Sequence, residues 1–275
     1  DGYLPIPSVH WTHPGFKLDI ASFGEGEPDD SRLVTRYRLT NTTQEAADYT
    51  LQLRVRPLQV NPPSQFLNTT GGVSPIETVR ISPNTVDVDG RFVVFSRDAT
   101  QMQVSAFASQ DTPLMMPSWH SAPRVRDPEK LASAALDYVV RLAPGESLDI
   151  AWVSTLSGTA KLDASGAAER QQTVARSWRS KLDRLQIKVP AQGQRVVDTL
   201  RTSLAHMLIS RVGPRLQPGT RSYARAWIRD GAMINEGLLR MGREDVAEEF
   251  LRWYAPFQFA SGKVPCCVDD RGSDP

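Results

Sequence analysis

The segment from Arg221 to Met233, RSYARAWIRDGAM, places two aromatic residues, three arginines and one aspartate directly before a predicted helix. The guanidinium of Arg229 presents a planar fork of donors, and the carboxylate of Asp230 presents two acceptor oxygens. The indole of Trp227 presents an apolar face against which the C–H face of a sugar ring can pack. The segment therefore suggests a carbohydrate-binding site, with Arg229 and Asp230 as the first candidates, Trp227 next and Tyr223 last.

A simpler interpretation makes Asp230 the cap of the helix that follows. Aspartate at a helix start accepts hydrogen bonds from the first free backbone amides. Trp227 and Ile228 would then pack in the core, and Arg229 would be a solvated charge. The residue types and their spacing leave both interpretations open.

Two adjacent carboxylates, Asp269 and Asp270, are the other acidic candidates. A carboxylate pair can perform acid–base chemistry when one member raises the pKa of the other. Adjacent side chains usually point apart, however, and aspartate is common in turns. We therefore predict a turn here.

The cysteines and histidines do not form a recognisable site. Cys266 and Cys267 are adjacent, so a disulfide between them would be strained, and they lack the spacing of metal ligands. No histidine falls in a nucleophile motif or joins two further metal ligands; the four are His10, His13, His120 and His206. We predict no catalytic residue, no metal site and no cofactor within this chain.

Composition excludes some classes of partner. The net charge of +1 gives no electrostatic reason to bind nucleic acid or an anionic membrane. No apolar run approaches the roughly 18 residues of a membrane span. Two cysteines are compatible with either cytoplasm or periplasm, so the compartment is not indicated. The first residue is Asp1 and the last residues read as a loop, so we expect a piece of a longer protein.

Residues 1–160 predict an antiparallel β-sandwich domain. Side chains alternate between two faces along several stretches, and Pro, Gly, Asn and Asp separate these stretches. They are residues 32–41, 49–60, 91–97, 102–109 and 136–156. The last stretch contains a turn at Pro144-Gly145-Glu146. No long helical pattern interrupts these strands, which argues against parallel βαβ units.

After residue 160 the spacing of the apolar residues changes from every second position to every third or fourth position. Residues 161–188 predict a linker helix, because Val174, Trp178, Leu182 and Leu185 share one helical face. Residues 189–275 predict three further helices, at 194–210, 231–242 and 243–258. The loops between these helices are long and rich in Trp, Arg, Gly and Pro, unlike those of a simple bundle.

The stretch YARAWIRDGAMINEGLLRMGREDVAEEFLRWY, with GKVP after it, resembles the start of the catalytic domain of six-hairpin, glucoamylase-like glycoside hydrolases. The resemblance covers about residues 189–269. The order of β-sandwich, linker helix and this motif is also similar to the bacterial glucoamylase-like group and to related sugar phosphorylases. It implies a supersandwich followed by the first helices of an α/α toroid.

The resemblance also implies roles for the residues. Arg229 and Asp230 match the pair that holds sugar hydroxyls at the cleavage subsite, and Trp227 matches an aromatic that shapes the pocket. The substrate would be an α-glucan or related oligosaccharide, hydrolysed with inversion. An inverting enzyme needs two carboxylates about 6.5–9.5 Å apart, and in this family they come from later hairpins.

The same resemblance predicts where apolar side chains lack partners. Helices of a toroid bury their faces against later helices, which would lie beyond Pro275. We therefore expect Leu238, Leu239, Phe250 and Trp253 to be partly exposed, and the β part to be the better folded half.

Three other interpretations remain open. A sugar phosphorylase would keep the fold and use inorganic phosphate in place of water. A non-catalytic carbohydrate-binding protein would use the sandwich itself. A purely structural protein, in which Asp230 is only a cap, would bind no saccharide.

Overall fold

The computed structural model describes residues 2–57, 59–61, 72–106, 119–159, 161–219, 223–270 and 272–274. The predicted strand stretches 49–60 and 102–109 therefore fall partly outside it, as do Arg221 and Ser222. The chain forms two compact units. The β unit comprises residues 6–64 and 71–174, and the helical unit comprises residues 1–5, 65–70 and 175–275. The domain boundaries predicted at residues 160 and 188 stay predictions.

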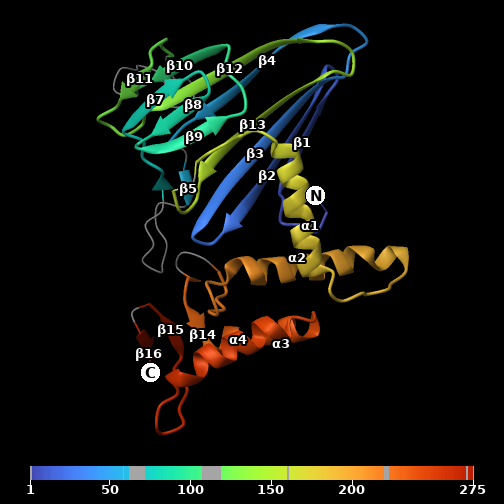
Figure 1. Ribbon diagram of the computed structural model, residues 1–275, viewed down its shortest axis with the longest axis vertical. Helices are drawn as coiled ribbons and strands as arrows, with labels where there is room; N and C mark the ends of the chain where they lie inside the picture. The colour runs from blue at the N-terminus through green and yellow to red at the C-terminus, as the bar shows by residue number, and fades with distance from the viewer. Residues whose placement is uncertain are drawn as a thin grey trace. The chain divides into compact units, whose positions relative to one another are not determined.

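The described part of the β unit is built from antiparallel sheets (Figure 1). The larger sheet has the strand order β1-β2-β3-β13-β9-β8-β7-β11, with bounds Ser8–His13, Phe16–Glu27, Asp30–Asn41, Ser147–Thr155, Arg91–Phe95, Thr85–Val88, Thr78–Ser82 and Arg124–Arg126. A smaller sheet has the order β10-β12-β4, with bounds Gln101–Ser105, Ser133–Leu142 and Ala47–Val55. A short pair joins β5, Gln59–Asn61, to β6, Gly72–Val73.

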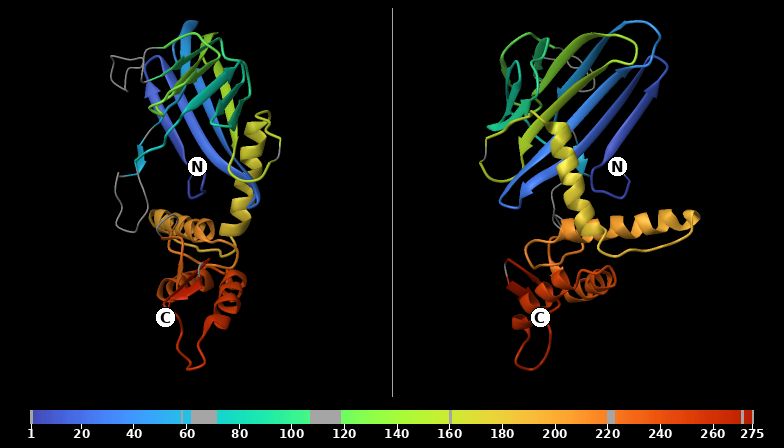
Figure 2. Two further views of the ribbon diagram at one scale, coloured as in Figure 1. Left: turned by 90° about the vertical axis from the view of Figure 1, so that its left-hand side faces the viewer. Right: turned by 45° about the vertical axis from the view of Figure 1, so that its right-hand side comes forward.

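One hydrophobic core lies between the larger and the smaller sheet. Its buried members include Leu39 from β3, Leu51 from β4, Leu136 from β12 and Ile150 from β13. Side chains from both sheets meet in one cluster, so the unit is the predicted antiparallel β-sandwich (Figure 2).

Strands β12 and β13 belong to different sheets, although they follow one another around the predicted turn. β12 pairs with β4 and β10, whereas β13 pairs with β3 and β9. Glu146 closes the turn, because its backbone N–H donates to the carbonyl of Ala143 and its carboxylate accepts from the Ala143 N–H. The chain thus crosses from one layer to the other within a few residues.

Asn41 fixes the corner where β3 ends. Its side chain is fully buried, and its amide nitrogen donates to the carbonyls of Glu45 and Leu142. Its Oδ1 accepts from the Thr43 backbone N–H and from the Tyr49 hydroxyl. Every polar atom of this buried amide is therefore used, which is the condition under which a buried amide is stable.

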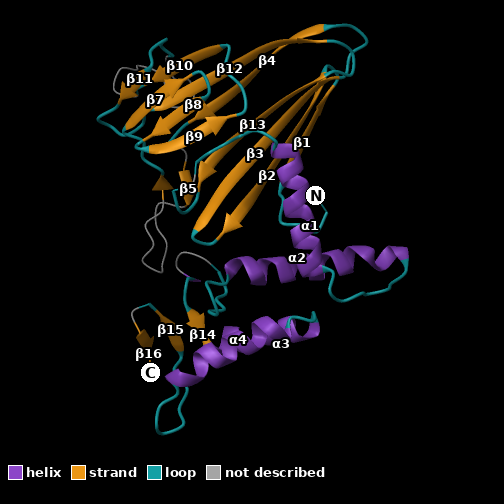
Figure 3. Cartoon of the chain, in the orientation of Figure 1, coloured by secondary structure: helices purple, strands orange, loops and turns teal. Residues whose placement is uncertain are grey.

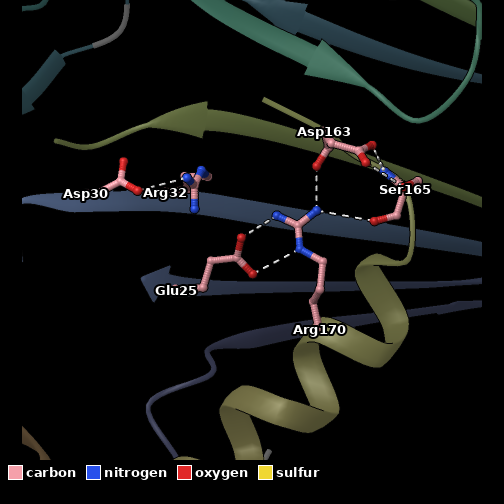
Figure 4. Close-up of polar contacts among 6 residues, drawn as sticks. All are labelled: Glu25, Asp30, Arg32, Asp163, Ser165 and Arg170. Carbon is pink, nitrogen blue, oxygen red and sulfur yellow. Dashed lines mark hydrogen bonds and ion pairs between the residues drawn. The ribbon is translucent and has the colours of Figure 1, made fainter. Parts of the chain in front are cut away.

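Helix α1, Ala167–Leu182, begins against strand β2. Arg170 forms an ion pair with Glu25 and donates to the carbonyls of Asp163 and Ser165 (Figure 4). Both members of this ion pair are largely buried, so solvent screens it weakly. The predicted linker helix is confirmed, and its first turn is fastened to the β unit.

The helical unit contains α2, Gln194–Ser210; α3, Ile228–Arg240; and α4, Glu244–Tyr254 (Figure 3). Short 3-10 turns lie at Ala191–Gly193 and Ala255–Phe257. A small antiparallel sheet joins β14, Ala226–Trp227, to β15, Cys267–Asp269, and β15 to β16, Gly272–Asp274. Among the described residues, no helix is both long enough and apolar enough to cross a membrane.

The expectation that Leu238 and Phe250 are exposed is wrong. Both are fully buried, because α3 and α4 pack on each other and the Phe250 ring lies against Gly231. A Cβ at Gly231 would lie 2.4 Å from the Phe250 ring, so this contact depends on glycine. Leu239 is exposed as expected, and Trp253 is partly exposed.

Two glycines of the β unit with nearly the same positive φ angle allow a matched test of packing. Gly158 has φ +76° and Gly145 has φ +75°. A Cβ at Gly158 would lie 2.6 Å from Asp30 Oδ1 and 2.7 Å from the Asp29 carbonyl oxygen, whereas a Cβ at Gly145 meets nothing within 4 Å.

We expect Gly145→Ala to lower the free energy of unfolding by about 1–2 kcal/mol, the penalty of a left-handed conformation. Gly158→Ala should lose roughly 1–3 kcal/mol more, because the methyl group also displaces the turn between β2 and β3. Urea unfolding followed by far-ultraviolet circular dichroism measures both. Equal losses would show that the close approach at Gly158 contributes nothing.

Candidate functional site

The strand β14 leads directly into helix α3, and this junction positions the predicted site residues. Trp227 is the last residue of β14 and pairs with Cys267 of β15. The next backbone N–H, that of Ile228, donates to the Cys266 carbonyl. Sheet pairing therefore continues up to the first helical residue, which fixes where α3 begins.

Asp230 is not the cap of α3. The capping position is occupied by Trp227, with extended backbone angles and no side-chain hydrogen bond to the helix. Asp230 lies in the first helical turn, where a carboxylate is stabilised by the partial positive charge of the helix start. The capping interpretation is thus corrected because the helix begins earlier than residue 231, at Ile228.

Arg229 and Asp230 form an ion pair, with Nη2 and Oδ2 3.3 Å apart. The Arg229 side chain is 80% exposed and the Asp230 side chain 28% exposed. The carboxylate is therefore held in the fold while the guanidinium remains in solvent. An exposed pair of this kind contributes little to stability.

Arg225 organises the sheet beneath the junction. It forms ion pairs of 3.0 Å with Asp269 and 2.6 Å with Asp274, and its guanidinium lies 6.0 Å from the centre of the Trp227 ring. The hydrogen bond from Arg225 lowers the pKa of the Asp274 carboxyl. These contacts join β14, β15 and β16 and support one face of Trp227.

Tyr223 is an aromatic neighbour of Trp227. Their ring centres are 6.1 Å apart and the rings are tilted by 54°. Among the predicted site residues, contacts thus join Tyr223 with Trp227 and Arg229 with Asp230.

Asp269 and Asp270 do not face each other as a carboxylate pair. Asp269 is bound to Arg225, whereas Asp270 forms a 2.7 Å ion pair with Arg215 and is otherwise exposed. Each carboxylate therefore pairs with a different arginine. The turn that follows β15 at Asp270 agrees with the sequence prediction.

A cavity of about 380 Å³ opens beside Asp230. We call it the α2–α3 cavity, and its lining comes from α2, from the loop after it and from α3: Ser203, His206, Met207, Ser210, Gln217, Pro218, Asp230, Met233 and Ile234. Asp230 is the predicted site residue that lines it. Its size lies at the lower end of the range typical of small-molecule sites.

The sequence patterns do not indicate that Arg225 or Gln217 belongs to the site region. Arg225 lies in the same motif, but its role depends on pairing between β14 and β15, which brings residues about forty positions apart together. Gln217 stands in a loop without periodicity. Sequence patterns in these stretches offered no signal for either contact.

The β unit also contains hollows. One of them, about 620 Å³ in volume, includes Phe92, Leu156 and Thr159 in its lining. Another of about 450 Å³ is lined by charged groups, of which Arg80 and Asp87 pair with each other. The first of these presents an aromatic side chain to solvent, since Phe92 is 53% exposed.

No protein-family model matches this chain, and a comparison with curated proteins finds no similar sequence. Among solved structures, one match is described as "Putative kojibiose phosphorylase from human microbiome". It has 9% sequence identity and a TM-score of 0.38, and it covers 97% of this chain. The chain spans 37% of the length of that protein.

The two cysteines of the site region should differ sharply in reactivity. Cys266 is exposed, whereas Cys267 is buried and its thiol donates to Asp274 Oδ2 at 3.3 Å. Burial, followed by the hydrogen bond to Asp274, raises the pKa of the Cys267 thiol to about 12. A raised pKa leaves the thiol protonated in the folded protein at pH values where an ordinary cysteine becomes a thiolate.

We expect iodoacetamide at pH 8.5 to alkylate Cys266 readily. The rate of alkylation of Cys267 should be at least a hundredfold lower. The Cys266→Ser variant should then resist labelling until it unfolds, whereas Cys267→Ser should label normally. Peptide mass spectrometry over pH 7–10 measures both sites. Comparable labelling of Cys267 in the folded chain would contradict the buried position of its thiol.

Proposed function

We propose that this chain is the sugar-holding part of a glycoside hydrolase and that it binds an α-glucan or related oligosaccharide at the start of α3. The observation that supports the proposal is the position of Asp230. Its carboxylate lies in the first turn of α3 and lines the α2–α3 cavity, with Arg229 beside it and Trp227 one turn before it.

In this proposal Asp230 accepts hydrogen bonds from two neighbouring sugar hydroxyls. Its ion pair with Arg229 is weak because Arg229 is exposed, so the guanidinium can turn to a ligand oxygen at small cost. Trp227 offers the ring against which the sugar packs, and the guanidinium of Arg225 supports that ring. Donor, acceptor and aromatic face are the groups that saccharide recognition requires.

The proposal assigns binding, not the acid–base step, to this chain. Several carboxylates of the helical unit pair with arginines, among them Asp269 with Arg225 and Asp245 with Arg243. Hydrolysis with inversion would take its acid and base from residues outside this chain, with a water between them. A sugar phosphorylase of the same fold would place inorganic phosphate where that water lies. Phosphate dependence of turnover in a longer protein that contains the chain distinguishes the two reactions.

The binding role is tested with Arg229→Ala and Asp230→Asn. We expect each to weaken binding of maltotriose by about 10- to 100-fold, the effect of losing a hydrogen bond to a charged group. Isothermal titration calorimetry on the intact chain gives the dissociation constants.

Matched controls separate binding from folding. Arg252→Ala removes an equally exposed arginine that pairs with Glu248 on α4, and Asp245→Asn removes a first-turn aspartate of α4. Both controls should bind maltotriose as the parent chain does. Unchanged binding in Arg229→Ala and Asp230→Asn would remove the basis of the proposal.

A second candidate function is saccharide binding by the β-sandwich. The observation in its favour is the exposed Phe92 ring in the 620 Å³ hollow of the β unit. Here Phe92→Ala would abolish binding while Asp230→Asn would leave it intact. The same titrations therefore decide between the two sites.

A further inference from the structure

Strand β1, Ser8–His13, lies at an edge of the larger sheet, where it pairs with β2 and with no other described strand (Figure 1). An edge strand offers unpaired backbone groups to any second strand, so folded proteins usually protect it with lysine, proline, a bulge or a covering segment. The six residues of β1, SVHWTH, contain no lysine, proline or acidic residue, and their register with β2 is regular. Protection by charge, by proline and by a bulge is therefore absent from β1.

The backbone of β1 alternates between groups that bond to β2 and groups that point away from it. The Ser22 N–H of β2 donates to the Pro7 carbonyl at 3.0 Å, which fixes the phase of the alternation. Antiparallel bonds recur at every second residue, so the odd-numbered residues of β1 bond to β2. Ser8, His10 and Thr12 therefore direct their N–H and C=O groups outward, and no backbone bond in the described part of the chain uses these groups.

The side chains of Val9 and Trp11 continue the core side of the sheet into solvent. They lie opposite Ile20 and Leu18 of β2, and so share a face with them. Leu18 is a buried member of the core, and Ile20 packs against that core. Val9 is nevertheless 49% exposed and Trp11 58% exposed. An apolar row therefore extends past the core, and covering it would remove apolar surface from water, which favours association.

The outer edge of β1 is complementary to itself. In an antiparallel pair of two β1 strands with His10 opposite His10, Ser8 of each copy lies opposite Thr12 of the other. Every outward N–H and C=O group of β1 then gains a partner. Shifting the register by two residues in either direction places Ser8 or Thr12 opposite a residue outside the strand. The register centred on His10 is therefore the one that satisfies the whole edge.

The same register also matches the side chains on both faces. On the core side, Trp11 of each copy lies opposite Val9 of the other, at positions without backbone bonds, where cross-strand side chains are closest. Aromatic and β-branched side chains form favourable cross-strand pairs. On the other side, His10 Nδ1 of each copy is 2.5 Å from Oδ1 of its own Asp19. A protonated His10 therefore brings its own counter-charge to the junction, which offsets the repulsion between two like charges.

We propose that β1 pairs with β1 of a second copy of this chain, with His10 opposite His10, and joins the two larger sheets into one. The occupant is a second copy because the reversed strand supplies both the backbone groups and the apolar side chains that this edge lacks. One short strand from each copy buries less than the roughly 1,600 Å² of a standard interface, so the dimer is weak and reversible. The inference goes beyond the proposed sugar site and does not depend on it.

Cysteine cross-linking tests the register. The exposed Cys266 is first removed by Cys266→Ser, so that the introduced thiol is the accessible one. His10→Cys then places two thiols across a bonded pair whose Cα atoms are about 5.5 Å apart, within disulfide range. Ser8→Cys is the matched control, because the two copies of residue 8 lie roughly 13 Å apart along the strands. With oxidised glutathione as oxidant, we expect His10→Cys to form the disulfide dimer at least tenfold faster than Ser8→Cys.

A mixture of two variants tests the same register from its ends. Residue 8 of one copy lies opposite residue 12 of the other. Ser8→Cys and Thr12→Cys should therefore cross-link when they are mixed and not when each is alone. Non-reducing electrophoresis measures the dimer in every sample.

Sedimentation velocity over a range of protein concentrations measures the association without a cross-link. We expect Val9→Lys and Trp11→Lys to weaken it at least tenfold, because each puts a charge into the apolar row. Both variants should stay folded, because the backbone at these positions remains bonded to β2. Val139→Lys is the matched control, since Val139 is 50% exposed on β12, a strand paired on both sides. It should associate as the parent chain does, and circular dichroism checks the fold of all three variants.

Three results would overturn the inference. The first is a parent chain that sediments as a monomer at every concentration, with no cross-link at residue 10. The second is equal cross-linking of His10→Cys and Ser8→Cys, which indicates random collision. The third is a dimer that persists in Val9→Lys and Trp11→Lys, which uses another surface. None of them alters the sugar titrations, so this inference and the proposed function can fail independently.

Discussion

The pairing of β14 with β15 determines where helix α3 begins, and the candidate site depends on that starting point. Trp227 completes the pairing, and the Ile228 N–H extends it by one hydrogen bond to Cys266. Arg225 then holds β15 and β16 through Asp269 and Asp274. Shifting the start of the helix by one residue would turn Asp230 by about 100° around the helix axis, away from the cavity. A small sheet without catalytic groups thus sets the direction of the groups that could bind a ligand.

The sequence predicted the elements well where one face of each is buried. The strands of the β unit and the helix 194–210 were found because their periodicity reflects a single buried face. Periodicity is local, however, and could not show that β12 and β13 lie in different sheets. It also could not show that Val34, on the face of β3 that carries the arginines, is fully buried. Whether a second face is covered depends on residues far away in the chain.

The sequence predicts the candidate site as a set of residues close together in the chain. It does not predict which more distant residues surround them. Tyr223, Trp227, Arg229 and Asp230 were identifiable from residue type and spacing alone. The ion pairs of Arg225 and the lining of the α2–α3 cavity arise from contacts across the fold, which residue types within one segment do not encode. The burial of Leu238 and Phe250 was missed for a similar reason. Helices α3 and α4 cover each other's apolar faces through a contact that requires Gly231.

Two kinds of ion pair distinguish the carboxylates that hold the fold from one that a ligand can reach. Arg225 pairs with a nearly buried Asp269, but Asp230 is paired with a guanidinium that is mostly in solvent. Exchanging a solvated partner for a ligand costs little, because that partner returns to water. In the proposed function, the weakness of the Arg229–Asp230 pair is what would allow Asp230 to accept hydrogen bonds from a sugar.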